Sequence, residues 1–232
     1  MSHVEFVSPR VDPGLPPSSD PLGEVLQLLQ LKGVLYCDAT LSEPWGVEIP
    51  QLPGVINVEV VTSGQCWLEL SGHDPVFMPE GSMVLIPRGN RHKLKGGPAH
   101  RTTPLEDIPV RRSGDLFETM EFGGGGRVTR MTYYGVRFDP YLAGRLINLL
   151  PDVLHLRTHA DEGSWLYNTI RFIDEEARKR QPGCETIITR LADVLVIQAI
   201  RTRTETAREE KRGWIAALHD RQIGAALLLM HR

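Results

Sequence analysis

The chain has 232 residues, 41% of them hydrophobic and 24% charged, which is the composition of an ordinary globular protein with one or two cores. A formal net charge of -3 gives no basic field that would argue for nucleic-acid binding. No apolar run approaches the roughly 20 residues that span a bilayer, and no leader opens the chain, so we expect a cytoplasmic protein without a membrane partner. The three cysteines, Cys37, Cys66 and Cys184, are widely spaced and predict neither disulfides nor a metal knuckle.

The N-terminal segment predicts a flexible lead-in followed by a helix. Residues 1–19 contain four prolines with glycine and serine and show little periodicity. Asp20 suits a helix N-cap and Pro21 suits the first helical position. Gly33 is expected to end this helix.

From Val34 to Phe138 short extended segments alternate with turn residues, which is typical of a β-sandwich or barrel. The expected strands are residues 34–36, 46–49, 55–62, 66–70, 83–86, 116–122 and 128–138. The turn sequence at 62–65 predicts that residues 55–70 form a hairpin. The four glycines at 123–126 are expected to be a flexible hairpin tip, because no helix or Lys-Ser/Thr follows to make a phosphate cradle.

After Asp139 the apolar period changes from two to 3.6, which indicates helices. Residues 141–150 predict a short helix, and Ser164 caps a second whose expected stripe is Trp165, Leu166, Thr169, Ile170, Ile173 and Ala177. Residues 185–204 predict the strongest helix, apolar around so much of its circumference that both the barrel and a second subunit are expected to cover it. Residues 202–212 are expected to be a charged linker, and 214–230 a last helix.

One turn carries a motif. Gly81 opens a strand, Pro87 and Gly89 turn the chain, and His92 follows at once. Glycine, Pro-x-Gly and histidine at these offsets resemble the second motif of the cupin β-barrels. The resemblance implies a jelly-roll barrel, and by itself it does not imply an enzyme.

The first cupin motif, which supplies most metal ligands in metal-dependent cupins, is missing its histidines and its glutamate. If Gly64 is the closing glycine of that motif, Asn57 stands at the glutamate position and residues 50–53 stand where His-x-His is required. A single imidazole does not hold a catalytic metal, which needs about three protein ligands, so no metal and no cofactor are expected. His92 keeps three interpretations: a structural histidine at the barrel mouth, a donor in a ligand pocket, or the ligand of an atypical metal site with Cys37 or Cys66.

A barrel, two helices, a charged linker and a further helix, in this order, resemble the N-terminal regulatory region of AraC-type transcription regulators. The matching patches are residues 20–46, residues 64–68 together with 85–92, and residues 214–232. The resemblance implies an α+β protein, with a lead-in at 1–19, a cupin-like effector-binding barrel at 20–139, a helical dimerisation region at 140–204, and a linker with the first helix of a DNA-binding half at 205–232. In that family two helix-turn-helix motifs follow, so DNA binding is expected only through a C-terminal half beyond this sequence.

The implied function is effector sensing and dimerisation, with a small molecule in the barrel and a homodimer as the assembly. The candidate effector-binding residues are His92, Trp67, Glu59, Tyr133 and Trp45, although their aromatic rings also suit a structural role. Strand alternation puts Asn57 and Glu59 on one face, which is expected to meet water or a pocket, with water favoured for each residue singly.

The candidate dimer-interface residues are Leu191, Leu195, Ile187 and Trp165. Two alternatives to the sensing function stay open. One is a small single-domain cupin metalloenzyme with an atypical metal site. The other is a dimerising decoy module that lacks a DNA reader of its own.

Overall fold

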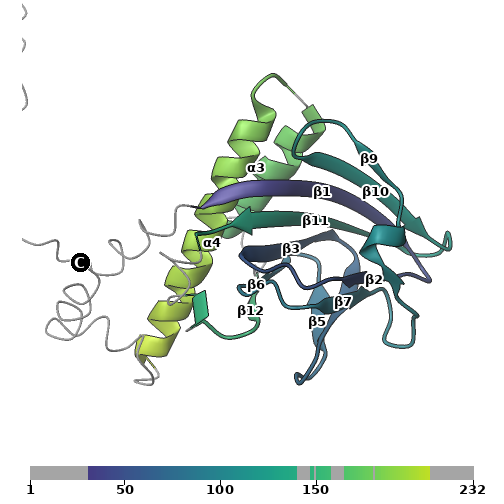
Figure 1. Cartoon of the computed structure of the whole chain (residues 1–232), viewed down its shortest axis with the longest axis horizontal. Helices are drawn as coiled ribbons and strands as arrows, with labels where there is room; N and C mark the ends of the chain where they lie inside the picture. The colour runs from purple at the N-terminus through teal and green to yellow at the C-terminus, as the bar shows by residue number, and fades with distance from the viewer. Residues whose placement is uncertain (1–30, 140–146, 149, 158–164, 180, 210–232) are drawn as a thin grey trace, which may run out of the picture.

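The computed structural model describes residues 31–139, 147, 148, 150–157, 165–179 and 181–209, and these form two stacked β-sheets with two helices against one of them (Figure 1). The expected N-terminal helix, the helix at 141–150, the Ser164 cap and the helix at 214–230 lie wholly or largely outside these residues. The predicted fold class, a cupin-like barrel followed by helices, is confirmed.

The larger sheet has seven strands in the order β12-β6-β3-β11-β1-β10-β9. Their bounds are β1 (Lys32–Ser42), β3 (Val55–Ser63), β6 (Ser82–Ile86), β9 (Val110–Arg112), β10 (Phe117–Gly123), β11 (Val128–Arg137) and β12 (Leu154–Arg157). The smaller sheet has the order β5-β4-β7-β2-β8, with β2 (Gly46–Ile49), β4 (Gln65–Leu70), β5 (Val76–Pro79), β7 (His92–Lys95) and β8 (Thr103–Pro104). A short 3-10 helix, η1 (Leu105–Asp107), follows β8.

The seven-stranded sheet is buried on both faces, and strand alternation divides its side chains between two cores. Ile56, Val58 and Val60 of β3 belong to a core shared with the helices, whereas Val61 belongs to a core shared with the five-stranded sheet. The expectation that Asn57 and Glu59 each face water is wrong, because they are 0% and 1% exposed. Their face of β3 is covered by the second sheet.

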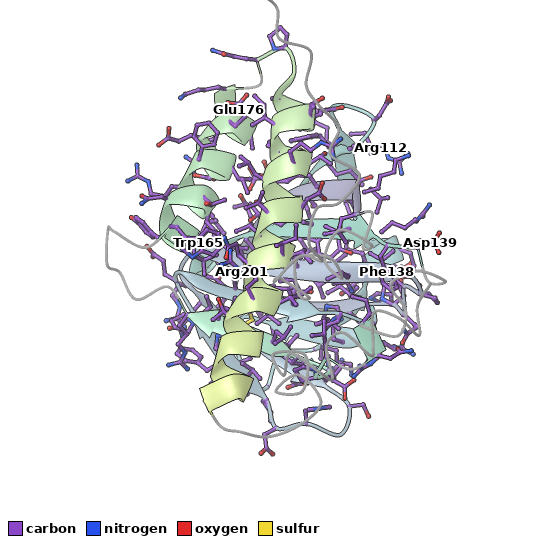
Figure 2. The ribbon with its side chains drawn as sticks, turned by 90° about the vertical axis from the view of Figure 1, so that its left-hand side faces the viewer. Arg112, Phe138, Asp139, Trp165, Glu176 and Arg201 are labelled. Atoms are coloured by element: carbon purple, nitrogen blue, oxygen red, sulfur yellow. The ribbon has the colours of Figure 1, made fainter. Side chains whose placement is uncertain are left out.

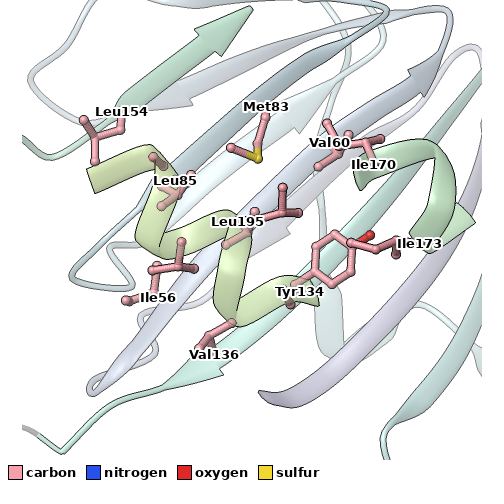
Figure 3. Close-up of a cluster of buried hydrophobic side chains, with 14 of the residues drawn as sticks. Ile56, Val60, Met83, Leu85, Tyr134, Val136, Leu154, Ile170, Ile173 and Leu195 are labelled. Atoms are coloured by element: carbon pink, nitrogen blue, oxygen red, sulfur yellow. The ribbon is translucent and has the colours of Figure 1, made fainter. Parts of the chain in front are cut away.

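The helices α3 (Trp165–Lys179) and α4 (Cys184–Glu209) cover the outer face of the seven-stranded sheet, with α4 lying across the strands and α3 beside it (Figure 2). Leu195 of α4 belongs to a cluster with side chains of β3, β6 and β11, among them Ile56, Met83 and Val136 (Figure 3). The predicted stripe on α3 is largely confirmed, because Leu166, Ile170, Ile173 and Ala177 are buried.

Two predicted boundaries are wrong. Gly33 does not end a helix but lies inside β1, which begins at Lys32 and is eight residues longer than the predicted three. The expected linker after residue 202 continues α4 as far as Glu209. Alanine, arginine and glutamate in this segment are good helix formers, so propensity agrees with the longer helix.

The predicted hairpin over residues 55–70 is also wrong. β3 pairs with β11 and β6, whereas β4 pairs with β5 and β7, so the turn at Gly64 carries the chain from one sheet to the other. Gly64 has φ +84, and a Cβ there would lie 2.8 Å from the carbonyl oxygen of Val128. The hydroxyl of Thr129 on β11 donates to the carbonyl of Gln65 at 2.8 Å and stabilises the turn between β3 and β4.

The glycine run at 123–126 is not a hairpin tip, because β1 lies between β10 and β11 in the sheet. The run instead wraps the end of β1. Gly124 N–H donates to the carbonyl of Ser42 at 2.9 Å, and Gly126 N–H donates to the carbonyl of Glu43 at 2.7 Å. A Cβ at Gly123 would lie 1.8 Å from the carbonyl oxygen of Ser42, so this close approach of two backbones requires glycine.

Candidate ligand-binding site

A cavity of about 230 Å³ lies between the two sheets and opens toward β9 and η1. Most of its wall is apolar and comes from alternate residues of neighbouring strands: Leu35, Cys37, Ala39 and Leu41 of β1, Val47 and Ile49 of β2, Leu94 of β7, Met120 of β10 and Met131 of β11. Leu105, Ile108 and Val110 complete the apolar lining around the opening. Such a wall suits a small, mainly apolar molecule.

Five polar or charged lining residues differ in depth. Glu59 and the half-buried Tyr133 come from the adjacent central strands β3 and β11, and Glu59 is 1% exposed. Glu106, Arg112 and Glu118 come from η1, β9 and β10, and the side chain of Arg112 is 79% exposed. Arg112 therefore marks the mouth, where its Nε donates to Glu118 Oε1 at 2.9 Å.

The buried Glu59 is held by His92 of β7, on the opposite sheet. His92 Nε2 contacts Glu59 Oε1, and His92 Nδ1 lies 2.7 Å from the carbonyl oxygen of Asn90. Since a carbonyl oxygen only accepts, Nδ1 carries a proton, and the contact between Nε2 and the carboxyl group needs one more. The pair thus holds a shared proton between the two sheets.

The electrostatics of this pair favour the proton on histidine. Burial alone would lower the pKa of His92, but the charge of Glu59, its hydrogen bond and the Asn90 carbonyl together raise that pKa above its ordinary value. An imidazolium facing a carboxylate is the result. Glu59 Oε2 then remains an acceptor, and it has no hydrogen-bond partner among the residues that the structure describes.

A second polar pair, Tyr133 and Asn57, lies beside the first, because Asn57 precedes Glu59 by two residues on the same face of β3. The hydroxyl of Tyr133 donates to Asn57 Oδ1 at 2.8 Å, and both residues come from adjacent strands. Because the Tyr133 proton is engaged there, its oxygen is left as an acceptor. Burial is the largest of the causes that raise the pKa of Tyr133, so the phenol stays protonated at neutral pH.

The donor set does not fit a metal ion. Within the described residues, no group of three or more histidine, cysteine, aspartate or glutamate side chains is placed to hold one. Burial raises the pKa of Cys37 to about 12, and it also raises that of Cys66, whose Sγ lies 4.0 Å from Met78 Sδ. Both cysteines are therefore neutral thiols in the metal-free protein.

The structure brings together only part of the predicted binding set. Glu59 and Tyr133 line the cavity, and His92 reaches it through Glu59. Trp67 is on the outer face of β4, where its ring centroid lies 5.0 Å from that of Phe77. Trp45 is 2% exposed, belongs to the core between the sheets and does not line the cavity.

The apolar wall was missed by the sequence reading. Cys37, Ala39 and Leu41 alternate along β1 in the same way as Asn57 and Glu59 along β3. The sequence predicts this alternation. It does not predict which face of β1 lines the cavity, because that depends on which strands pair.

The four predicted dimer-interface residues differ in their exposure. Leu195 is 0% exposed and Leu191 is half-buried against the helix-and-sheet core. Ile187 and Trp165 are each 39% exposed. The side chain of Leu195 therefore packs within the chain, whereas Leu191, Ile187 and Trp165 keep some solvent-exposed surface on the helices.

Comparison with known proteins adds the family. A family model described as Cupin matches residues 20–205, and the chain belongs to this cupin family. Two proteins described as putative AraC-like transcription regulators, from Streptomyces lividans and Streptomyces antibioticus, are 28% and 29% identical, each match covering 92% of this chain and 69% of the relative. RclR of Escherichia coli, described as an RCS-specific HTH-type transcriptional activator, is 23% identical over 91% of this chain and 65% of its own length. The expected resemblance to AraC-type regulators is confirmed.

Among solved structures, ToxT of Vibrio cholerae with a bound unsaturated fatty acid is similar, with 9% identity and a TM-score of 0.40, over 77% of this chain and 55% of that chain. This chain thus corresponds to little more than half of ToxT. Among the described helices, none is long and apolar enough to cross a membrane.

Proposed function

We propose that this chain is the effector-sensing and dimerisation region of an AraC-type transcription regulator, and that it is not an enzyme. The observation that carries this proposal is the position of the cavity: it lies against one face of the seven-stranded sheet, and α3 and α4 lie against the other face. The relatives described as regulators support the regulatory role. DNA would be contacted by a C-terminal half like that of such regulators.

The central strands give a route from ligand to helix. Along β1, Cys37 and Ala39 line the cavity, whereas Tyr36 between the helices and the sheet lies 4.6 Å from Phe117 and 5.2 Å from Tyr134, ring to ring. A molecule that fills the cavity shifts the balance between arrangements of this strand and thereby of the helices on it. The ligand acts only through the difference in its affinity for those arrangements.

The outer faces of the helices support homodimer formation. Trp165 and Phe172 on α3, seven residues apart, are 39% and 51% exposed. Ile187 and Val194 on α4, also seven residues apart, are 39% and 42% exposed. An apolar row repeating every seven residues on neighbouring helices suits a second copy of the same surface.

The cavity is tested by filling it. A collection of one-ring and short-chain metabolites is screened by thermal shift against the wild-type protein, Ala39→Leu, which fills the cavity, and Thr40→Leu, the next residue on the opposite face of β1. Ligands of the cavity should raise the Tm of the wild type and Thr40→Leu, should leave Ala39→Leu unchanged, and should slow amide exchange in α4. A collection without hits, or hits that stabilise all three proteins alike, would contradict the proposal.

The dimer is tested by light scattering after size-exclusion chromatography. The pair Ile187→Glu and Val194→Glu should give a monomer. Val128→Glu, which changes an equally exposed valine at the start of β11, should leave the dimer intact. A wild-type protein that is monomeric at micromolar concentration would refute this part.

A further inference from the structure

We propose that the cavity selects a small, mainly apolar molecule whose polar group is a hydrogen-bond donor, an alcohol, phenol or amine, and that it rejects carboxylates. This inference rests on the proposed function, because it names the chemistry of the effector for the same site. Four properties of the lining lead to it.

The first property is an unpartnered acceptor at the deep end. Glu59 lines the cavity and is 1% exposed; its Oε1 is taken by His92, and its Oε2 has no hydrogen-bond partner in the described part of the chain. A buried acceptor without a partner is unfavourable, and a donor placed beside it removes that penalty. A ligand with an O–H or N–H group directed at Glu59 supplies that donor.

The second property is that the neighbouring polar atom is also an acceptor. The Tyr133 hydroxyl, which lines the cavity beside Glu59, gives its proton to Asn57. Glu59 and Tyr133 therefore present two acceptor oxygens to the cavity. Thr132 also lines the cavity, and its hydroxyl, which has no partner among the described residues, can donate or accept and does not discriminate between the two classes of ligand. An ionised carboxylate has only acceptors and matches neither oxygen.

The third property is the charge of the lining. Among the lining residues that the structure describes, Glu59, Glu106 and Glu118 are acidic, and Arg112 is the basic one. Arg112 is engaged by Glu118 at the exposed mouth. Even with the His92 imidazolium opposite Glu59, the rim stays acidic, so the field disfavours anions.

The fourth property is size. About 230 Å³ is below the roughly 300 Å³ at which sites for drug-sized ligands begin, and it equals the liquid volume of about eight water molecules at ~30 Å³ each. The fit is therefore to a molecule with one ring or a short chain. One donor group on such a molecule reaches the deep end while its carbon atoms contact the apolar wall.

The test uses four one-ring probes of matched size: benzyl alcohol, benzylamine, toluene and benzoate. Their dissociation constants are measured by NMR titration of the whole chain at neutral pH. Hydrogen bonds to charged groups are the strong ones, so the alcohol and the amine are expected to bind about tenfold or more tighter than toluene. Benzoate is expected to bind more weakly than toluene.

Two variants assign the preference to one atom. Glu59→Gln keeps the size of the side chain but replaces the carboxylate, and it should reduce the preference for amine over toluene to within about threefold, because the charged acceptor is gone. Glu121→Gln makes the same change of charge on an exposed residue of β10 outside the cavity lining, and it should leave the preference for alcohol and amine over toluene unchanged. If Glu59→Gln does not melt cooperatively, the wild-type ranking with Glu121→Gln decides alone.

The outcomes separate the two proposals. If no probe binds, or if all bind Ala39→Leu as tightly as the wild type, both the cavity as effector site and its preference are overturned. If toluene or benzoate binds the wild type as tightly as the alcohol and amine, or if Glu121→Gln abolishes the preference, the donor requirement is overturned while the cavity stands as the site.

Discussion

His92 and Glu59 join the two sheets through a contact between Nε2 and Oε1, with the two residues 2% and 1% exposed. Removing one member leaves the other as an uncompensated buried charge, which typically costs 3–5 kcal/mol. His92→Ala should therefore lower the free energy of unfolding by about 4 kcal/mol, measured by urea denaturation.

A second histidine provides the control for this prediction. His100 Nδ1 contacts the carbonyl of Trp45 at 3.2 Å and has no carboxylate partner within the described part of the chain, so His100→Ala should cost only about 1 kcal/mol. The double change of His92 and Glu59 to leucine should cost less than His92→Ala, because no charge is stranded. Equal losses for the two single histidine variants would contradict a charged pair.

The same pair predicts a pH dependence. The pKa of His92 is raised above 6.5 in the folded protein by Glu59 and the Asn90 carbonyl, against the effect of burial. A folded-state pKa above the unfolded value means that the stabilisation is complete below about pH 6.5 and is lost as pH rises through the folded-state pKa. As the pH rises from about 6.5 through the folded-state pKa of His92, the Tm of the wild type should fall relative to that of His92→Asn. An NMR titration in which His92 titrates below 6.5 would refute the assignment.

Asp193 on α4 predicts a stabilising change. Burial raises its pKa from 3.8 to about 6 against the effect of Arg190, and its Oδ1 lacks a partner among the described residues. Because the folded-state pKa is the higher one, protonation stabilises the fold at low pH, and this is lost between about pH 4 and pH 6. After allowance for solvent screening, Asp193→Asn should add roughly 1 kcal/mol at pH 7. The gain should shrink at pH 5, and an equal gain at both pH values would contradict this cause.

Gly64→Ala should lower the stability through a steric contact, and Gly72→Ala is the control without that contact. Gly64 and Gly72 have φ of +84 and +81, but a Cβ at Gly64 meets the Val128 carbonyl at 2.8 Å, while one at Gly72 meets nothing within 4 Å. Gly72→Ala should cost about 1 kcal/mol for the left-handed conformation alone, and Gly64→Ala about 1–3 kcal/mol more. Chemical denaturation measures both, and equal losses would show that the corner yields to the added methyl group.

Local patterns in the sequence predicted seven of the twelve strands that the structure describes, and they did not predict which strands pair. They missed the short strands β5, β7, β8 and β9, and also β12, which lies within the region expected to be helical. β2 agrees with its predicted range, and β3, β4, β6, β10 and β11 agree within one residue at each end, since turn residues delimit them. The assumed hairpin at Gly64 and the assumed tip at Gly123 were wrong for a common reason. A short turn between two strands is compatible with pairing or with a change of sheet, and long-range contacts such as those between β1 and β11 decide.

The site was predicted in the same uneven way. Glu59, His92 and Tyr133 are predicted as polar or aromatic residues of the barrel; Glu59 and Tyr133 line the cavity, and His92 contacts Glu59 without lining it. Trp45 and Trp67 are candidates because of their rings alone. Neither lines the cavity, because Trp45 is buried in the core between the sheets and Trp67 lies on the outer face of β4. The partnership of Glu59 with His92 joins residues 33 positions apart and has no local signature.

A single β-sheet separates the cavity from the helices, and successive side chains of its strands point alternately to the two sides. Cys37, Ala39 and Leu41 line the cavity, while Tyr36 packs in the core under the helices. Under the proposed function, substitutions at Cys37, Ala39 and Leu41 would change which molecule the cavity accepts while the helical side of β1 stays the same. Insertion of one residue in this strand would exchange the two faces and disrupt the cavity lining and the core under the helices together.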